Sequence, residues 1–198
     1  PPARYARPAS ALEAQRQDID YFRQLIDMDR SFSADARAEA DARLDALAGS
    51  TAADIQAAME RREALRTWPM RGTVHLVPPR DAHWMLDLMG VRALAGAEAR
   101  RAYLGLDAAV ADRAVEVLGA ALAGGGRFTR AQCLATLEAA GITGEGQRLY
   151  HLLWYASQRG VLCIAPHVGK EQTFVLLDEW VPDPHRPERD EALGIIAH

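Results

Sequence analysis

The stretch that decides the fold lies in the second half of the chain, at residues 145–177, and reads EGQRLYHLLWYASQRGVLCIAPHVGKEQTFVLL. Its beginning predicts a helix over about residues 145–159, because apolar side chains recur there at the spacing of one helical face: Leu149, Leu152, Leu153 and Ala156. Two apolar runs, at residues 161–164 and 173–177, then predict the strands of a hairpin with its turn at residues 167–170. We therefore expect a helix that leads directly into a β-hairpin.

Two more helices are predicted immediately before this stretch. Asp107 is placed to cap the first, whose apolar positions follow helical spacing until the glycines at 124–126 end it. Thr129 is placed to cap the second, which Gly141 terminates. Three helices followed by a two-stranded hairpin make up the winged-helix arrangement, which we expect here.

The first half of the chain shows the same order of elements. Helices are predicted over residues 11–28, 34–47 and 53–64, and a hairpin with the sequence RTWPMRGTVH follows at residues 66–75. The expected fold is therefore mainly α with small β-hairpins, built from tandem winged helix-turn-helix units. The predicted divisions are a first unit, a helical connector, a second unit, and a linker with the start of a further unit, at residues 1–78, 79–106, 107–182 and 183–198.

The first hairpin crowds arginine, tryptophan and histidine around two turn residues, Pro69 and Gly72. Arg71 and His75 are expected near the mouth of this hairpin, where a positive charge and an imidazole suit contact with nucleic acid. A packed edge with solvated charges fits the same residues, because arginine stems commonly cover apolar surface. Both interpretations stay open at this point.

Composition restricts the kind of nucleic-acid binding that is expected. The chain of 198 residues carries a formal net charge of −4, whereas binding without selectivity depends on an excess of positive charge. Lysine occurs once, at Lys170, so arginine supplies nearly all the positive charge and can grip phosphate bidentately. A negative net charge still allows a local cluster of arginines to bind nucleic acid. The preference for arginine over lysine can also reflect nothing more than a GC-rich genome.

Other sequence features set the cellular and chemical context. No apolar run approaches membrane-spanning length and no signal-peptide core is present at the start, so a cytoplasmic location is expected.

Cys133 and Cys163 fall in an apparent helix and an apparent strand without a neighbouring cluster of metal ligands. We expect buried free thiols, no metal and no cofactor.

The helix at about residues 145–159 has a second face that suits DNA. Its members are expected to point away from the core and to reach base edges or phosphates: Arg148, His151, Tyr155 and Gln158. His167 and Lys170, at the tip of the following hairpin, are placed to touch a phosphate or a minor groove. The alternative is that the helix face is simply exposed to solvent and that the hairpin tip is an ordinary exposed loop, since both would carry the same residues.

Several separated motifs together resemble the AlkZ-like winged-helix DNA glycosylases. They are RTWPMRGTVHLV, GQRLYHLLWYASQRG, the Gly169-Lys170 turn and QTFVLLDEWVP, which occur in the family's order over about residues 43–198. The resemblance implies tandem winged-helix units around a DNA channel and hydrolysis of the N-glycosidic bond of alkylated or crosslinked bases, without a metal. It also implies that relatives continue into a further unit, so we expect an N-terminal fragment or a short form.

The family's catalytic signature is Gln, an apolar residue, then Gln or Asp, upstream of the first hairpin. The expected positional equivalent is Asp27-Met28-Asp29, which keeps the polar, apolar, polar order but replaces the first Gln by Asp. In this assignment, Asp29 would orient or deprotonate water and stabilise positive charge on the sugar. The amide that Asp27 replaces would hold water without adding charge. Gln15-Arg16-Gln17 is the alternative, and two solvated helix carboxylates remain possible.

The resemblance also assigns binding residues. Arg71 is expected to contact phosphate, and His75 to hydrogen-bond water or phosphate unless it only pins the hairpin. The remaining expected DNA contacts are Arg66, Gln147, Arg148, His151 and Lys170. Trp68 and Trp180 are expected in the core, because each has apolar neighbours in or beside a strand.

Three functions are compatible with the sequence. The first is a monofunctional DNA glycosylase acting on double-stranded DNA that carries alkylated or crosslinked bases. The second is a non-catalytic winged-helix DNA-binding module or transcription regulator, which would insert its third helix into the major groove. The third is a protein-interaction scaffold. The lesion, the sequence preference and the oligomeric state do not follow from the sequence.

Overall fold

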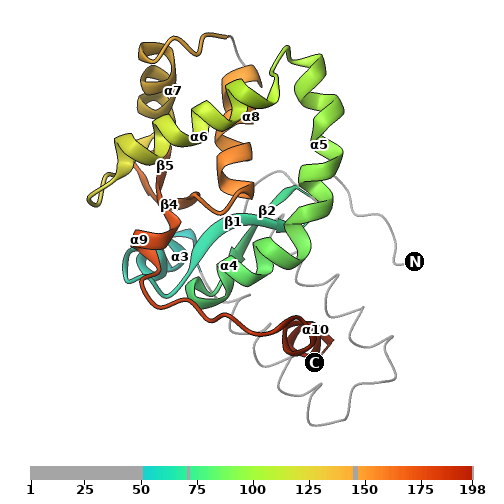
Figure 1. Ribbon diagram of the computed structural model, residues 1–198. Helices are drawn as coiled ribbons and strands as arrows, with labels where there is room; N and C mark the ends of the chain where they lie inside the picture. Colours follow the sequence, from blue (N-terminus) through green and yellow to red (C-terminus); the bar gives the residue numbers. More distant parts are fainter. Residues whose placement is uncertain (1–50, 71, 145–146, 198) are drawn as a thin grey trace, which may run out of the picture. The chain divides into compact units, whose positions relative to one another are not determined.

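The structure is a computed structural model that describes residues 51–70, 72–144 and 147–197 (Figure 1). Asp27, Asp29 and Arg71 lie outside the described residues, as do the helices expected at 11–28 and 34–47. The chain divides into two compact units, one of residues 1–56 with His198 and one of residues 57–197. The description below concerns the second unit.

One antiparallel sheet organises this unit. Its first hairpin consists of β1 (Leu65–Met70) and β2 (Thr73–Val77), and its second consists of β4 (Leu162–Val168) and β5 (Glu171–Leu176). A short strand, β3 (Phe128–Thr129), completes the five-stranded order β2-β1-β4-β5-β3.

The two hairpins that the sequence assigns to separate units therefore share one sheet. They meet where β1 pairs with β4, with Arg66 opposite Ile164. Both hairpins are confirmed, while the arrangement as tandem winged-helix units stays a prediction. β4 continues through Val168, so the turn of the second hairpin contains only Gly169 and Lys170.

The helices of the second predicted unit are confirmed with small shifts. They are α6 (Ala108–Leu122), α7 (Arg130–Ala139) and α8 (Gln147–Gln158). Asp107 caps α6 by accepting from the Val110 amide, and Thr129 forms a capping box with Gln132 at the start of α7. The mainly helical class of the fold thus follows from local signals in the sequence.

The segment between the hairpin and α6, predicted as a helical connector, consists of several helical elements. A 3₁₀ turn, η1 (Pro79–Asp81), leads into α4 (Ala82–Met85), a π-helical turn η2 (Leu86–Gly90) and α5 (Val91–Tyr103). Pro78 and Pro79 were expected to end the strand and open this connector. Proline suits the first helical position, where the N–H that it lacks would have no partner within the helix.

Three further helices complete the described elements. α3 (Ala52–Glu60) begins in the first unit and ends in the second, before β1. α9 (Leu177–Trp180) follows β5, and α10 (Arg189–Ala197) lies within residues 183–198. No helix within the described ranges combines the length and the apolar character needed to cross a membrane.

Two apolar clusters cover the two faces of the sheet, which explains the burial of β4 at five successive residues. Leu162 and Ile164 join Trp68 and the inner faces of α6, α7 and α8 in the larger cluster. Cys163 and Ala165 join the smaller cluster with residues of α4, η2 and α9. A strand buried on both faces is expected to show a continuous apolar run, as β4 does.

Buried tryptophan and cysteine side chains agree with the sequence. Trp68 is only 3% exposed and lies within the larger cluster. Trp180 is half-buried, packs against the smaller cluster and has the Arg62 guanidinium 4.5 Å from its ring centroid. Cys133 and Cys163 are free and buried. These residues therefore serve the packing of the fold.

Candidate nucleic-acid interface

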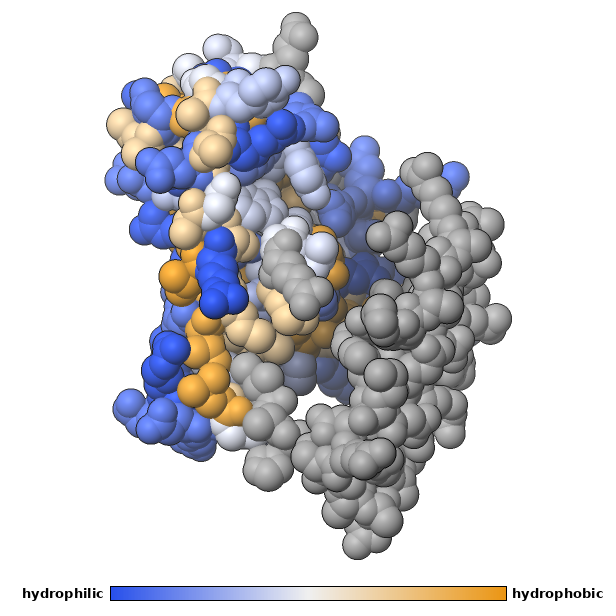
Figure 2. All heavy atoms as spheres, turned by 90° about the vertical axis from the view of Figure 1, so that its right-hand side faces the viewer, coloured by the Kyte–Doolittle hydropathy of each residue, from blue (hydrophilic) through white to orange (hydrophobic). Residues whose placement is uncertain are grey.

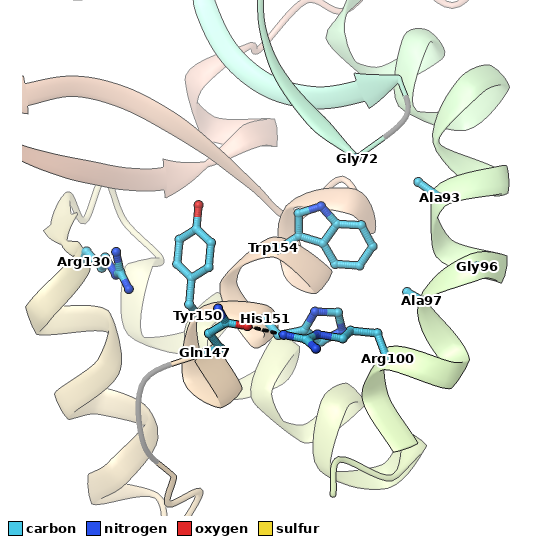
Figure 3. A pocket seen from close by; sticks show the side chains of 10 residues that line it. All are labelled: Gly72, Ala93, Gly96, Ala97, Arg100, Arg130, Gln147, Tyr150, His151 and Trp154. Atoms are coloured by element: carbon cyan, nitrogen blue, oxygen red, sulfur yellow. Dashed lines mark hydrogen bonds between the residues drawn. The ribbon is translucent and has the colours of Figure 1, made fainter. Parts of the chain in front are cut away.

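A pocket of about 690 Å³ opens between α5, α8 and the β1–β2 turn (Figure 3). We call it the aromatic pocket. Its lining residues come from four parts of the chain that the fold brings together: Gly72, Ala93, Gly96, Ala97, Arg100, Arg130, Gln147, Tyr150, His151 and Trp154.

The two sides of the aromatic pocket differ in size and chemistry. On α5 the lining residues Ala93, Gly96 and Ala97 follow helical i, i+3, i+4 spacing and leave room beside the helix. On α8 the rings of His151 and Trp154 stack with centroids 5.0 Å apart and planes inclined by 24°. Figure 3 shows the indole of Trp154 extending toward Ala93 and Ala97. The aromatic side of the pocket therefore lies opposite a wall of small residues.

Polar groups from α5, α7 and α8 also line the pocket. Arg100, in the last turn of α5, donates from Nη2 to Oε1 of Gln147 at the start of α8. Arg130 places its guanidinium 4.4 Å from the ring centroid of Tyr150, in the range of a cation–π contact. The pocket thus combines two arginines, an amide and three aromatic rings.

The surroundings of His151 favour its neutral form. Burial, and then the positive charges of Arg100 and Arg101, lower the pKa of the imidazole below its usual value. Its Nε2 atom is buried and has no hydrogen-bond partner among the residues that the structure describes. A neutral imidazole offers one donor and one acceptor nitrogen, so this side chain retains capacity for a polar ligand.

Gly72 closes the aromatic pocket from the side of the first hairpin. Its φ of +69° is the left-handed conformation that glycine adopts at no steric cost. A Cβ at this position would lie 3.6 Å from Cζ2 of Trp154, so the backbone of the turn passes close to the indole. The hairpin turn and the ring are therefore packed against each other.

A second hollow of about 530 Å³ lies between the start of α7 and the β4–β5 hairpin. We call it the wing hollow. It is lined by Arg130, Ala131, Leu134, His167, Lys170, Glu171 and Gln172, so Arg130 belongs to both hollows. Burial, and then the charge of Arg66, lower the pKa of His167. Arg130 and Lys170 carry positive charge here, and Glu171 carries the opposite one.

Figure 2 faces the side of the molecule that α5 occupies in Figure 1. Hydrophilic residues predominate in the upper part of this view, where Figure 1 places the end of α5 and the start of α8. Arg100 and Gln147 are among the polar residues that line the aromatic pocket.

The predicted site residues are only partly brought together. Gln147 and His151 both line the aromatic pocket, and Lys170 lines the wing hollow. Arg66 is half-buried on β1, where burial lowers the pKa of its guanidinium. His75 lies on β2 with Nε2 2.8 Å from the Thr73 hydroxyl, a contact within the hairpin. Their roles in DNA binding stay predictions.

Arg148 has a role inside the protein. Its Nη1 donates to the carbonyl oxygen of Leu104 at 2.8 Å, which joins the start of α8 to the end of α5. A Cβ on Gly144 would lie 2.3 Å from Cδ of Arg148, so the side chain occupies space that only glycine leaves open.

Tyr155 and Gln158 were expected on an outward face of α8, and this expectation is wrong. Their side chains are 6% and 3% exposed. Tyr155 donates its hydroxyl to Asp112 on α6, and Gln158 donates to the carbonyl oxygen of Trp68. α8 packs against α5, α6, α7, β1 and β4, so a single inner stripe does not describe its contacts.

Four of the polar or aromatic residues that line the aromatic pocket were not singled out from the sequence: Arg100, Arg130, Tyr150 and Trp154. One local signal was available. Tyr150 and Trp154 are four residues apart on a predicted helix and therefore share a face. The contribution of α5 depends on how that helix packs against α8, which no local pattern indicates.

Comparison with a solved structure establishes the class of fold. The DNA glycosylase AlkZ of Streptomyces sahachiroi matches with a TM-score of 0.58 and 24% sequence identity, over 73% of this chain and 40% of that one. The two proteins therefore share a fold over the matched part, and the chain spans less than half of that protein's length.

The sequence match identifies the family. The family described as DNA glycosylase AlkZ-like matches residues 34–198, and the chain belongs to this family. A comparison with curated proteins gave no match. Asp27 and Asp29 precede the matched residues.

Proposed function

We propose that this chain binds double-stranded DNA and belongs to a glycosylase that excises alkylated or crosslinked bases. The observation that carries the proposal is the wing hollow, where Arg130 on α7 and Lys170 on the hairpin turn line one space. Two cations from separate elements suit a phosphodiester backbone, and Glu171 offsets only part of their charge. Membership of the AlkZ-like family supports the same assignment.

The proposed reaction is hydrolysis of the N-glycosidic bond. Positive charge develops on the sugar as the damaged base departs and water attacks, so a carboxylate near the sugar stabilises the transition state. Asp29 is our candidate for orienting or deprotonating that water, and Asp27 for holding it. A cationic alkylated purine is already a good leaving group, which makes one carboxylate and one positioned water sufficient.

The alternative of a transcription regulator requires the third helix to enter a major groove. Burial of Tyr155 and Gln158 removes two of the side chains that α8 would use for this purpose. We therefore favour contact through the wing hollow and the aromatic pocket over insertion of α8.

Activity is tested by incubating the full-length protein with duplex DNA that contains N7- or N3-alkylated purines and measuring abasic sites. Cleavage is expected, and Asp29→Asn should remove most of it. Cleavage that Asp29→Asn leaves unchanged would show that the assigned carboxylate is wrong. Absence of cleavage together with salt-sensitive binding to undamaged DNA would favour the non-catalytic module.

DNA contact is tested separately by the salt dependence of binding to an undamaged duplex. Lys170→Ala and Arg130→Ala should each weaken binding and reduce the slope of log K against log salt by about one. Arg92→Ala is the matched control, because Arg92 is exposed on α5 and lines neither hollow. Equal slopes for all three variants and the unaltered chain would contradict the proposed contact.

A further inference from the structure

We infer that the aromatic pocket receives an unpaired nucleobase from the DNA strand whose phosphates contact the wing hollow. The inference rests on the proposed function, because it concerns a base that belongs to bound DNA. It adds a second contact of different chemistry, made by rings and amide groups instead of phosphate-binding cations.

The shape of the aromatic pocket suits a flat ring. Its volume of about 690 Å³ lies within the range of sites that enclose small organic ligands. The stacked His151 and Trp154 rings form one boundary, and Ala93 and Ala97 lie across from the indole (Figure 3). Every base presents a π-face, so stacking on such a surface tolerates any base identity.

Polar groups are available for the edge of that base. The neutral His151 has a buried Nε2 without a hydrogen-bond partner among the described residues. Gln147 accepts from Arg100 through Oε1, and its amide nitrogen carries two N–H donors. A nucleobase edge presents both donors and acceptors and can satisfy such groups, which an aliphatic ligand cannot.

The position of Arg130 connects the two hollows. Its side chain lines both of them and lies over the Tyr150 ring between α7 and α8. A base is joined to its own phosphate through one sugar, so a strand held at the wing hollow has a base within reach of the adjoining pocket. Paired bases are inaccessible inside the duplex, and the occupant must therefore be unpaired or extruded.

The test compares two duplexes of equal length, one fully matched and one with a single bulged 2-aminopurine. Binding is measured by anisotropy and stacking by 2-aminopurine fluorescence. The unaltered chain should prefer the bulged duplex and quench its fluorescence. Trp154→Ala should weaken binding of the bulged duplex by about 5- to 150-fold, which corresponds to one lost stacking contact, and leave matched-duplex binding unchanged.

Two further variants separate stacking from general damage to the fold. Trp154→Phe keeps an aromatic face and should retain most of the preference for the bulge. Val91→Ala removes an exposed apolar side chain from α5 that does not line the pocket, and should behave like the unaltered chain. Thermal unfolding of each variant verifies that it is folded.

The outcomes are distinguishable. Equal affinity for both duplexes, or equal weakening of both by Trp154→Ala, would overturn the base pocket while the proposed DNA binding stands. If deoxyadenosine monophosphate alone quenches the fluorescence of Trp154 at the concentration at which the bulged duplex binds, that result would assign the pocket to free nucleotides instead. Failure to bind either duplex would overturn the proposed function itself.

Discussion

Gln158 donates from Nε2 to the carbonyl oxygen of Trp68 at a distance of 2.8 Å, and this buried hydrogen bond joins the last turn of α8 to β1. The two residues are 90 positions apart in the sequence. The bond therefore connects the first hairpin with the helix that carries the rings of the aromatic pocket.

Gln158→Ala should lower the free energy of unfolding by about 1–3 kcal/mol, because it leaves the Trp68 carbonyl oxygen buried without its donor. Urea unfolding measures this change. Glu116→Ala, an exposed substitution on α6, serves as the control and should shift stability by no more than about 0.5 kcal/mol. Equal effects of the two variants would contradict the role of Gln158.

Gly90 and Gln158 should be energetically coupled. A Cβ at position 90 would lie 2.8 Å from Oε1 of Gln158, closer than real Cβ atoms approach an oxygen. Gly90→Ala should therefore destabilise the unaltered chain more than it destabilises the Gln158→Ala variant. A double-mutant cycle in urea measures the difference, expected at about 0.5–3 kcal/mol, and additive effects would contradict the contact.

Gly144→Ala should destabilise the fold by about 1–3 kcal/mol. The new Cβ would lie 2.3 Å from Cδ of Arg148, so the arginine must move and release its hydrogen bond to the Leu104 carbonyl oxygen. Gly119→Ala on α6 is the matched control. Its Cβ would make only an ordinary contact, 3.9 Å from Val161, and should stabilise the helix by about 0.5–1 kcal/mol. Thermal unfolding should show a lower melting temperature for Gly144→Ala and a higher one for Gly119→Ala than for the unaltered chain.

His151 should make stability fall as the pH falls. Its pKa is lowered in the folded state from the ordinary value of 6.5, so below that pH the unfolded chain takes up a proton that the folded chain resists. The loss of stability that this proton uptake causes is absent well above pH 6.5 and grows below it. His151→Asn should therefore lose less stability than the unaltered chain between pH 7.5 and 5.5. Parallel urea-unfolding profiles for the two proteins would contradict the shift.

The thiols should be unreactive in the folded protein. Burial raises the pKa of Cys133 to about 12 and raises that of Cys163 as well, so little thiolate is present at pH 8. A thiol reagent should modify neither residue in buffer and both in concentrated urea. Rapid modification without urea would show that one of these cysteines is accessible.

Local signals in the sequence were sufficient for most of the secondary structure in the described ranges. The caps of α6 and α7, and the hairpins with Gly72 and Gly169 at their turns, depend on neighbouring residues and were correctly predicted. β3 was not predicted, because a two-residue strand has no periodicity and forms only by pairing with β5.

The candidate site was less predictable than the fold. Gln147 and His151 were identified on α8, whereas Arg100 and Trp154 were not. Tyr155 and Gln158 were expected to face outward, and both are buried because they meet Asp112 and Trp68, residues distant in the sequence. Helical periodicity indicates which residues share a face, but it does not indicate how many neighbours surround the helix.

By itself, the sequence determined the helices α6, α7 and α8, the hairpins, the buried cysteines and the resemblance to the AlkZ-like DNA glycosylases, because each depends on residue identity at short range. Only the tertiary structure decided that both hairpins share one sheet through β1 and β4, and that α5 faces α8 across the aromatic pocket. The physical reason is that strand pairing and helix packing unite segments far apart in the chain. The pocket exists only after those contacts have formed.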